Sequence, residues 1–478
     1  MARYEEDINK RRAKREAMRK KQQAEQRRLL MGLIAAAVVL VLCGVGIFLL
    51  ARQNGSAPEE EKTTQKPQSS QPIQPTQAAA QQQNTLTTIH IKAAGDLNIT
   101  NSVVDAGLSG TGYDYTKAFM DVASTLADAD LTVLNFEGNI CGEPYGTETT
   151  SAPREILTAL RNAGVDMLQM ANSCSINNGL IGLNSTLTAI REAGLVPLGA
   201  YATPADFRES GGYTVVDVQG IRVAFVAFTK GVGGMGMPSG NEDCVNLLYT
   251  DYATTYDEID RDGITAILNN VAAEKPDITI AMLHWGSEYS DVVSSSQESI
   301  VSLMKKNGVD VILGTHPHTV QEVAFDKAAG TLVAYSLGDF FGNATKGGTN
   351  YSIILDIEIT KDAASGATRV TDFSYTPIYT VTEGECPDGY RRVVRIEKAI
   401  EAYTENYLDK VTTACKDSMT YALQRIVERI AVPTEVKCSE CRKELEVLVN
   451  SRTDTLVTTV TCKCGNVFAS GSSIKEYE

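Results

Sequence analysis

The chain has 478 residues, of which 43% are hydrophobic, enough for two or three domains with a sizeable core. Its net charge of −15 hides an asymmetry, because residues 1–28 contain 11 Lys and Arg against 5 acids, or +6, which leaves −21 for the rest. This acidic main body excludes nucleic acid as a favoured partner, since phosphate groups repel it.

Residues 29–51, LLMGLIAAAVVLVLCGVGIFLLA, carry no charge. At a rise of about 1.5 Å per residue, a helix of this length crosses a bilayer. A cleaved signal peptide is the alternative, but its apolar core is usually only about 7–15 residues long. We therefore expect a single-pass protein of the cell membrane, with the basic segment 1–28 in the cytoplasm and the main domain extracellular.

The rest of the chain divides by composition. Residues 52–85 are rich in Gln, Pro, Ser, Thr and Ala, which predicts a disordered linker. In 86–400 short apolar runs alternate with helical stretches, which predicts an α/β domain. The pattern of residues 401–432 predicts a helical connector. Residues 433–478 are expected to form a small separate tail.

The apolar runs of the α/β domain predict strands at 88–94, 131–136, 165–171, 222–228, 278–283, 309–314, 331–337 and 351–359. Helices are predicted at 115–129, 153–164 and 297–308. The last two end in Asn-Ala-Gly and Lys-Asn-Gly, which are typical helix ends.

Polar clusters follow six of these strands: GDLN, NFEGN, ANSCSINNG, HWGSEY, GTHPH and SLGDFFGN. Ligands bind at the carboxyl edge of open α/β sheets, so residues from distant clusters are expected to converge there. The residues expected to converge are Asp96, Glu137, Asn172, His284, His316 and His318. They include three of the four histidines of the chain; the fourth, His90, is interpreted as structural.

Carboxylates, an amide oxygen and imidazoles are the ligand types of a transition-metal pair such as Mn²⁺, Fe²⁺ or Zn²⁺. Two such ions about 3.5–4 Å apart can clamp the oxygens of a phosphoryl group, and Glu137 has the reach and charge to bridge them. In His316-Pro317-His318, an extended backbone would place both imidazoles on one side.

The run from GDLNIT through NFEG, ANSCSINNGLIGLNSTLTAIREAGLVPLGA, HWGSEY, GVDVILGTHPHTVQ and YSLGDFF resembles the CapA/PgsA family of capsule and poly-γ-glutamate biosynthesis proteins. The resemblance covers about residues 88–380. It implies a calcineurin-like metallophosphatase fold, a two-sheet β-sandwich flanked by helices, outside a membrane anchor.

The resemblance also implies how the ligands divide. Asp96, Glu137 and His318 would hold one metal, and Glu137 with Asn172, His284 and His316 the other. Further residues that could contact substrate or support the ligands are Asn98, Asn135, Glu288, Tyr289 and Asp339. Lys230, after the strand at 222–228, could meet an anionic substrate or stand in a solvated loop.

Three positions depart from the family pattern. Cys174 stands where the family has the histidine that protonates the leaving group, and Asn177 where it commonly has aspartate. A thiol is a poorer proton donor than imidazolium, and losing general acid catalysis typically costs about 10²–10⁴ in rate. Asp339 replaces a usual asparagine and adds negative charge, which favours retention of cations if it points inward.

These observations support two main functional hypotheses. The first is a membrane-anchored protein with a metal-dependent hydrolase site that acts, with polymer-synthesis membrane proteins, in synthesis, export or anchoring of an anionic surface polymer such as poly-γ-glutamate or capsule polysaccharide. The second is a non-catalytic metal-binding scaffold or polymer-binding module, which Cys174 and Asn177 favour. A structural surface protein that binds a partner through its tail is a third hypothesis.

The tail contains CSEC, twenty further residues and CKCGN, which gives the spacing C-x₂-C-x₂₀-C-x-C for Cys438, Cys441, Cys462 and Cys464. This spacing resembles a zinc ribbon, in which two tight turns supply four thiolates to Zn²⁺. Disulfides are the alternative for a domain outside the cytosol. We favour zinc, because disulfide frameworks rarely use two such close pairs.

Overall fold

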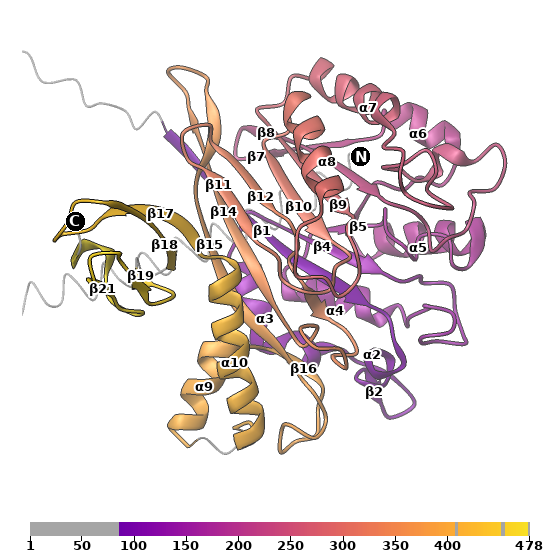
Figure 1. The fold of residues 1–478 in the computed structure, drawn as a ribbon. Helices are drawn as coiled ribbons and strands as arrows, with labels where there is room; N and C mark the ends of the chain where they lie inside the picture. The colour runs from indigo at the N-terminus through magenta and orange to yellow at the C-terminus, as the bar shows by residue number, and fades with distance from the viewer. Residues whose placement is uncertain (1–85, 407–409, 451–454, 477–478) are drawn as a thin grey trace, which may run out of the picture. The chain divides into compact units, whose positions relative to one another are not determined.

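The computed structural model of the protein describes residues 86–406, 410–450 and 455–476 (Figure 1). The predicted cytoplasmic segment 1–28, membrane helix 29–51 and linker 52–85 lie outside these residues. Within the described ranges, no helix is both long enough and apolar enough to cross a membrane.

The larger of two main sheets has eight strands, and its centre is parallel (Figure 1). Strand β1 pairs in parallel with β4, β4 with β5 and β5 with β6, whereas β14, β15 and β16 add antiparallel strands on the other side of β1. In spatial order the strands are β16 (Arg392–Arg395), β15 (Thr368–Val381), β14 (Tyr351–Asp362), β1 (Leu86–Asn98), β4 (Leu131–Glu137), β5 (Met167–Gln169) and β6 (Val196–Leu198), with β13 (Asp339–Phe341) also pairing with β1.

The smaller main sheet has six strands. Strands β12, β10, β9 and β8 are parallel to one another, and β11 and β7 close the two edges in antiparallel pairing. Their order is β11 (Val323–Asp326), β12 (Thr331–Ala334), β10 (Val311–Thr315), β9 (Ile278–His284), β8 (Ile221–Thr229) and β7 (Thr214–Val218).

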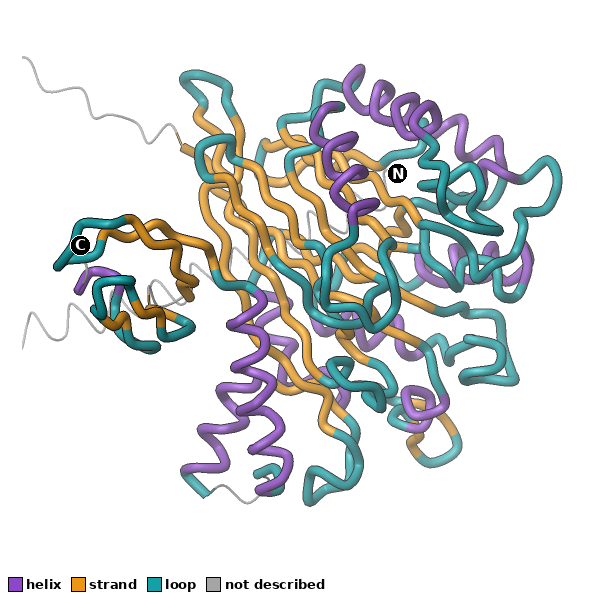
Figure 2. Tube along the Cα trace, viewed as in Figure 1, coloured by secondary structure: helices purple, strands orange, loops and turns teal. Residues whose placement is uncertain are grey.

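Alternation along the strands of the smaller sheet builds two cores. On β8, Val223 and Phe225 join the core shared with the larger sheet, whereas Ala224 and Val226 face a second core under helices α7 and α8. Because both faces are covered, β8 and β9 are nearly continuous apolar runs, as expected for buried parallel strands. Figure 2 shows the strands of both sheets running side by side between the helices.

The helices cover the outer faces of the sheets. Phe119 of α3 and Leu160 of α4 are buried in the core that includes the larger sheet, and Met419 of α10 joins the same core. The helices are α2 (Asn101–Asp105), α3 (Thr116–Ala127), α4 (Glu155–Ala163), α5 (Gly179–Glu192), α6 (Pro204–Ser210), α7 (Arg261–Ala273), α8 (Ser295–Lys306), α9 (Ile396–Thr404) and α10 (Thr413–Arg429).

The predicted two-sheet α/β architecture flanked by helices is confirmed, and each predicted strand and helix of this domain overlaps an observed one. The predicted helix ends are also confirmed: Gly164 and Gly308 adopt the left-handed conformation directly after α4 and at the end of α8. Two predicted strands are longer than observed, since β5 ends at Gln169 and β12 at Ala334. The chain then turns to deliver the polar clusters that follow.

The tail forms separate small sheets around its own core of buried residues, including Val447, Val449 and Phe468. Its strands are β17 (Val432–Lys437), β18 (Glu444–Asn450), β19 (Thr455–Leu456), β20 (Val460–Thr461) and β21 (Val467–Phe468), and a 3₁₀ turn spans Ile474–Glu476. Elsewhere, β2 (Leu108–Ser109) and β3 (Gly112–Tyr113) form a short hairpin, and Glu242–Cys244 is a 3₁₀ turn. The proposed limits of the domain, connector and tail at 86–400, 401–432 and 433–478 stay predictions.

Candidate metal centre

The carboxyl ends of strands from both main sheets supply one cluster of buried polar side chains. Asp96 and Glu137 come from β1 and β4 of the larger sheet. His284 ends β9 of the smaller sheet, and His316 and His318 follow β10. All five side chains are buried, and the structure brings them together in overlapping groups.

A bulge in β1 brings Asp96 to the cluster. The register between β1 and β4 shifts between Ala94 and Asp96, and Asp96 donates its backbone N–H to the Gly338 oxygen over 2.9 Å. A Cβ atom on Gly95 would lie 1.7 Å from that oxygen, so only glycine allows this approach of the two backbones.

Glu137 joins a first group of potential ligands with His284 and His316, whose ligand atoms all lie within 4.8 Å of one another. The Oε1 atom of Glu137 is 2.9 Å from Nε2 of His284. The other ring nitrogen, Nδ1, lies 3.2 Å from the Thr315 hydroxyl. Thr315 therefore occupies Nδ1 and leaves Nε2 of His284 directed towards Glu137.

His318 joins a second group with Asp96 and Asp339, again with ligand atoms within 4.8 Å. Its Nδ1 lies 2.8 Å from Oδ1 of Asp339 and 3.4 Å from Oδ2 of Asp96. Its Nε2 lies 3.8 Å from Oε2 of Glu137. The two carboxylate oxygens of Glu137 thus face different groups, one directed to His284 and the other to His318.

Amide side chains hold the carboxylates in place. Asn135 donates to Oδ1 of Asp96 over 2.6 Å, and its own oxygen accepts a bond from Asn172 over 3.1 Å. Asn172 also donates to the Phe136 carbonyl over 2.7 Å, and its oxygen accepts the backbone N–H of Cys174 over 3.0 Å. Asn172 is therefore brought beside the cluster, with its hydrogen bonds directed to β4 and to Cys174.

The backbone of the His-Pro-His loop differs from the extended form that the sequence analysis expected, so that expectation was wrong. His316 has φ 91° and His318 has φ 58°, both in the left-handed region that non-glycine residues rarely adopt. The Asp96 carboxylate accepts the backbone N–H of His316, with 3.1 Å to Oδ2. Strained backbone of this kind concentrates at functional sites.

Burial and mutual repulsion disfavour negative charge in the cluster. Burial, and next the charge of Glu137, raise the pKa of Asp96 to about 7. Burial likewise raises the pKa of Glu137 and of Asp339. Burial opposes a charged imidazole at His318, but the carboxylates led by Asp339 and Glu137 raise the pKa of His318 well above its usual value.

The other two histidines are held neutral. Burial lowers the pKa of His284 to about 3 and lowers that of His316 well below its ordinary value. A neutral imidazole has a lone pair to offer, which is the form that binds metals. Three buried carboxylates therefore face a single cationic side chain, His318, and two neutral imidazoles.

Two buried atoms in the cluster, Oε1 of Glu137 and Nδ1 of His316, make no hydrogen bond in the part of the chain that the structure describes. Oε1 of Glu137 has its 2.9 Å contact with Nε2 of His284, but that contact is not a hydrogen bond. Such orphaned groups are costly unless a ligand satisfies them. Together with the excess of carboxylates, they fit a site built for divalent cations.

Cys174 occupies the turn after β5. Burial, and next the charge of Glu137, raise the pKa of its thiol far above the usual range. The neighbouring Ser173 hydroxyl lies 3.0 Å from Nε2 of His284, whereas Cys174 contacts the predicted ligand Asn172 through its backbone N–H. Asn177 donates its amide to the Thr150 hydroxyl over 3.1 Å.

The remaining predicted support residues lie around the cluster. Tyr289 stacks on the ring of His318 with centroids 5.7 Å apart, and 47% of its surface is exposed. Glu288 is exposed and lies within ligand distance of His316 and His318. Asn98, at the end of β1, pairs in register with Glu137.

Two supporting residues were not singled out from the sequence. Thr315 links His284 to Gln169. Its hydroxyl lies 3.2 Å from Nδ1 of His284 and donates to the side-chain oxygen of Gln169 over 3.2 Å. Ser173 is the second. Both are ordinary polar residues whose only signal is that they adjoin predicted ligands.

The four tail cysteines form a separate group. Their sulfur atoms all lie within 4.8 Å of one another. Their number and spacing could be read from the sequence, and the structure brings all four together.

A known protein family matches this part of the chain. The sequence profile of the family described as "Bacterial capsule synthesis protein PGA_cap" matches residues 90–344, just over half of the 478 residues. The chain belongs to this family. The matched segment contains every residue of the two carboxylate–histidine groups.

Two curated proteins from Bacillus are similar to part of this chain. "Capsule biosynthesis protein CapA" of Bacillus anthracis is 27% identical over 242 residues, covering 48% of this chain and 54% of that protein. "PGA biosynthesis protein CapA" of Bacillus subtilis is 26% identical over 187 residues, 39% of this chain and 45% of that protein. The chain thus spans about half the length of the curated relatives that it matches.

Two solved structures that are similar to part of this chain are distant from it in sequence. A calcineurin-like phosphoesterase of Bacillus subtilis is 14% identical, with a TM-score of 0.40 over 72% of this chain and 97% of that one. A putative 5'-nucleotidase of Staphylococcus aureus is 12% identical, with a TM-score of 0.41 over 61% and 54%. At these scores the similarity adds no argument about chemistry.

Proposed function

We propose that the candidate metal centre binds two divalent transition-metal ions, Mn²⁺, Fe²⁺ or Zn²⁺, and that it serves in synthesis, export or anchoring of an anionic surface polymer, either poly-γ-glutamate or a capsule polysaccharide. The observation that carries the proposal is the position of Glu137, with one oxygen facing each group of ligands. A carboxylate in that position can bridge two cations.

The proposed ligand groups follow from the contacts. Glu137, His284 and His316 would hold one ion. Asp96, His318 and Asp339 would hold the other, with the second oxygen of Glu137 in reach. Asp339, which was expected to support the ligands, would thereby also be a ligand itself. Asn172 stays a candidate ligand through its oxygen, which now accepts the Cys174 N–H.

A pair of bound cations would supply a nucleophile at neutral pH and would stabilise the oxygens of a phosphoester in displacement. The side chains of the chain itself prepare the site. Thr315 fixes the orientation of His284, and Asn135 fixes that of Asp96. Such outer contacts typically change metal affinity or activity by about 10–100-fold.

Charge near the site favours an anionic substrate. The ammonium group of Lys230 donates to the Gly286 carbonyl over 2.8 Å and lies 4.5 Å from the centre of the Tyr256 ring. Burial lowers its pKa, and its charge acts on His284 and His316. We assign Lys230 to the capture of an anionic group beside the metal centre. Lys230→Met should then raise KM for a phosphoester more than it lowers kcat.

The enzymatic proposal is tested by hydrolysis of p-nitrophenyl phosphate by the purified chain with Mn²⁺. Turnover that is abolished by His284→Gln and kept in His90→Gln would support a hydrolase. His90 is the matched control because it lies on the far part of β1, half exposed, where it contacts Asp356. No turnover in the parent would sink the hydrolase proposal.

The high pKa of Cys174 favours a second candidate function, a metal-dependent polymer-binding scaffold. A thiol that holds its proton so firmly gives it up poorly to a leaving group near neutral pH. The test is Cys174→His. Turnover that appears only in this variant supports the scaffold, whereas turnover in the parent that the variant increases supports a slow hydrolase.

The site would work at the cell surface under this proposal. Residues 29–51 would anchor the chain, with 1–28 in the cytoplasm and the metal-binding domain outside, beside membrane proteins of polymer synthesis. Protease added to intact cells should then digest the domain and leave 1–28 protected. Protection of the domain would contradict this topology.

A further inference from the structure

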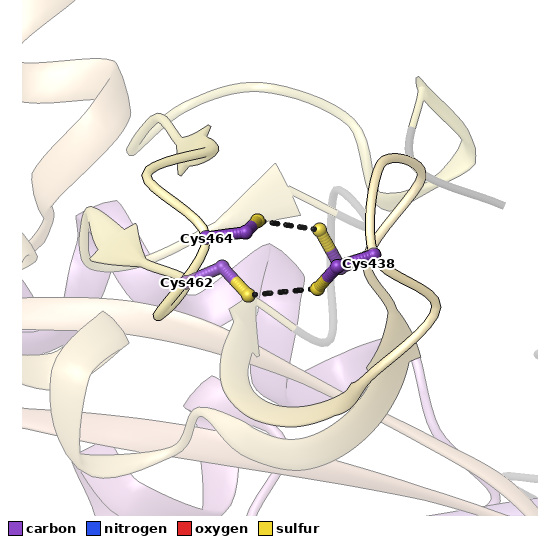
Figure 3. Close-up of side chains that lie close together, drawn as sticks. Cys438, Cys462 and Cys464 are labelled. Carbon is purple, nitrogen blue, oxygen red and sulfur yellow. Dashed lines mark hydrogen bonds between the residues drawn. The ribbon is translucent and has the colours of Figure 1, made fainter.

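The four tail cysteines have a geometry that differs from that of disulfides. The Sγ atoms of Cys438 and Cys464 are 3.6 Å apart, and those of Cys441 and Cys462 are 3.5 Å apart. A disulfide would require about 2.05 Å. Four sulfurs at about 2.3 Å from a tetrahedral zinc ion are separated from one another by about 3.75 Å. Figure 3 shows the sulfurs of Cys438, Cys462 and Cys464 directed to one common point between two loops.

The two loops are built alike. In the first loop, the backbone N–H of Cys438 donates to the Lys443 carbonyl over 2.9 Å, and the backbone N–H of Arg442 donates to the Cys438 carbonyl over 2.8 Å. Arg442 adopts the left-handed conformation, with φ 62°. These bonds fold the Cys-x₂-Cys segment after β17 into a tight turn that directs both sulfurs to the same side.

The second loop repeats this pattern with one residue fewer. The backbone N–H of Cys462 donates to the backbone carbonyl of Asn466 over 2.8 Å, and the backbone N–H of Gly465 donates to the Cys462 carbonyl over 2.9 Å. Gly465 is left-handed, with φ 97°. The shorter turn matches the shorter Cys-x-Cys spacing, so both spacings present a pair of sulfurs from a reciprocally bonded turn.

The surroundings suit a negatively charged cluster. Four thiolates around one Zn²⁺ carry a net charge of −2, which needs nearby positive charge or hydrogen-bond donors. The amide of Asn466 donates to Sγ of Cys438 over 3.6 Å. Basic residues also flank both turns in the sequence: Lys437, Arg442, Lys443 and Lys463.

The tail has little else to stabilise it. Apart from cysteines, the buried apolar residues in the described part of the tail are Val436, Val447, Val449, Leu456 and Phe468. Two cysteines, Cys438 and Cys462, complete this core, so the sulfur cluster lies where the tail is packed. A module of this size usually requires a metal or cross-links in addition to its apolar core.

We propose that Cys438, Cys441, Cys462 and Cys464 together bind one structural zinc ion and that this ion holds the tail folded. Four thiolates in a tetrahedral arrangement select zinc or iron, and a closed set of four protein ligands is typical of structural rather than catalytic zinc. This site is separate from the carboxylate–histidine centre and does not depend on its proposed function.

The test is the zinc content of the full-length chain, measured by mass spectrometry after purification without chelator. The double variant Cys438→Ser/Cys464→Ser should lose about one zinc per chain relative to the parent. Cys141→Ser, which removes a cysteine outside the cluster, should lose none. His284→Gln should lose metal from the other centre and keep this zinc.

A second variant separates loss of zinc from a general failure to fold. Cys464→His should retain zinc, because three cysteines and one histidine also form structural sites, whereas it cannot form the Cys438–Cys464 disulfide. In limited proteolysis, the parent and Cys464→His should resist cleavage within 433–478, and the double serine variant should be cut there first.

Three results would overturn the proposal. One is unchanged zinc content in the double serine variant. Another is iron bound by these cysteines in place of zinc. The third is a parent chain whose intact mass is lower by two hydrogens for each cross-loop cystine, joining Cys438 to Cys464 or Cys441 to Cys462.

Discussion

Oε1 of Glu137 and Nε2 of His284 lie 2.9 Å apart, although the two residues belong to different sheets and are separated by 147 positions in the chain. The contact exists because β4 and β9 end at the same edge of the two packed sheets. The candidate metal centre therefore depends on the packing of the two sheets. Replacing Glu137 should weaken both groups of ligands, whereas replacing His284 should weaken its own group.

Replacing His284 should remove metal from the centre. We expect His284→Gln to weaken binding by more than about 100-fold, beyond the about 10–100-fold typical of outer contacts, because a direct ligand is lost. Isothermal titration calorimetry with Mn²⁺ measures the change in metal affinity. His90→Gln is the control, and equal losses in both variants would show that His284 acts through general stability.

Asn135 should matter although it is not a predicted ligand. Asn135→Ala removes the 2.6 Å bond to Asp96, and we expect metal affinity to fall by about 10–100-fold with the fold retained. Asn246→Ala is the matched control, because Asn246 is also a buried amide but donates to the carbonyls of Gly212 and Ala227. Unchanged affinity in Asn135→Ala would refute its orienting role.

The stability of the metal-free protein should fall as the pH rises above 6.5. The folded-state pKa of Asp96 is raised to about 7 and that of His318 is raised well above its ordinary value. The native state therefore holds protons that the unfolded state has released, so unfolding is favoured as the pH rises through the folded pKa values. His284 and His316 are neutral in the folded state, and in the unfolded state their ordinary pKa is 6.5. They therefore oppose the trend only near the start of this window, where the unfolded imidazoles release their last protons.

Metal should reverse this dependence, because carboxylates and imidazoles bind cations in their deprotonated forms. Thermal unfolding at pH 6.5 and 8, with chelator and with Mn²⁺, measures both effects. We expect the rise in Tm on adding Mn²⁺ to be larger at pH 8. A chelated protein that is more stable at pH 8 than at pH 6.5 would contradict the assignment of raised pKa values.

The bulge at Gly95 should tolerate no side chain. In Gly95→Ala the new Cβ would meet the Gly338 oxygen at 1.7 Å, and we expect a loss of at least about 2 kcal/mol in the free energy of unfolding together with weaker metal binding, since Asp96 is the next residue. Gly347→Ala adds a Cβ with nothing within 4 Å and serves as the control in denaturant unfolding. Similar losses in both variants would show that the close approach is not the cause.

Much of the architecture could be predicted from hydrophobic runs alone. Parallel strands buried on both faces, such as β8 and β9, are nearly continuous apolar segments and are easy to recognise. Strand β15 was missed because it carries Pro377 and several charged or polar residues, which argue against a strand. It forms through long-range pairing with β14, which no local pattern reports.

The sequence indicated which residues could form the candidate metal centre, but it did not indicate how their side chains contact one another. The rule that polar residues gather at carboxyl ends of parallel strands was sufficient to bring Glu137 and His284 together. It could not show that Asp339, in the three-residue strand β13, pairs with His318 at 2.8 Å, because β13 reaches the cluster only through its pairing with β1. Nor could it show the left-handed backbone at His316.

That left-handed backbone carries a cost in stability that other contacts of the fold must offset. A non-glycine residue at positive φ typically costs about 1–3 kcal/mol, and the loop contains two of them, His316 and His318. Glycine adopts the same angles without penalty. A His318→Gly chain would be freed of this backbone cost, but three buried carboxylates would then lose the imidazolium that faces them. We expect it to hold cations poorly and to unfold in chelator at a lower temperature than the parent. The ion pairs of the imidazole, rather than the backbone itself, therefore keep the turn in its strained form.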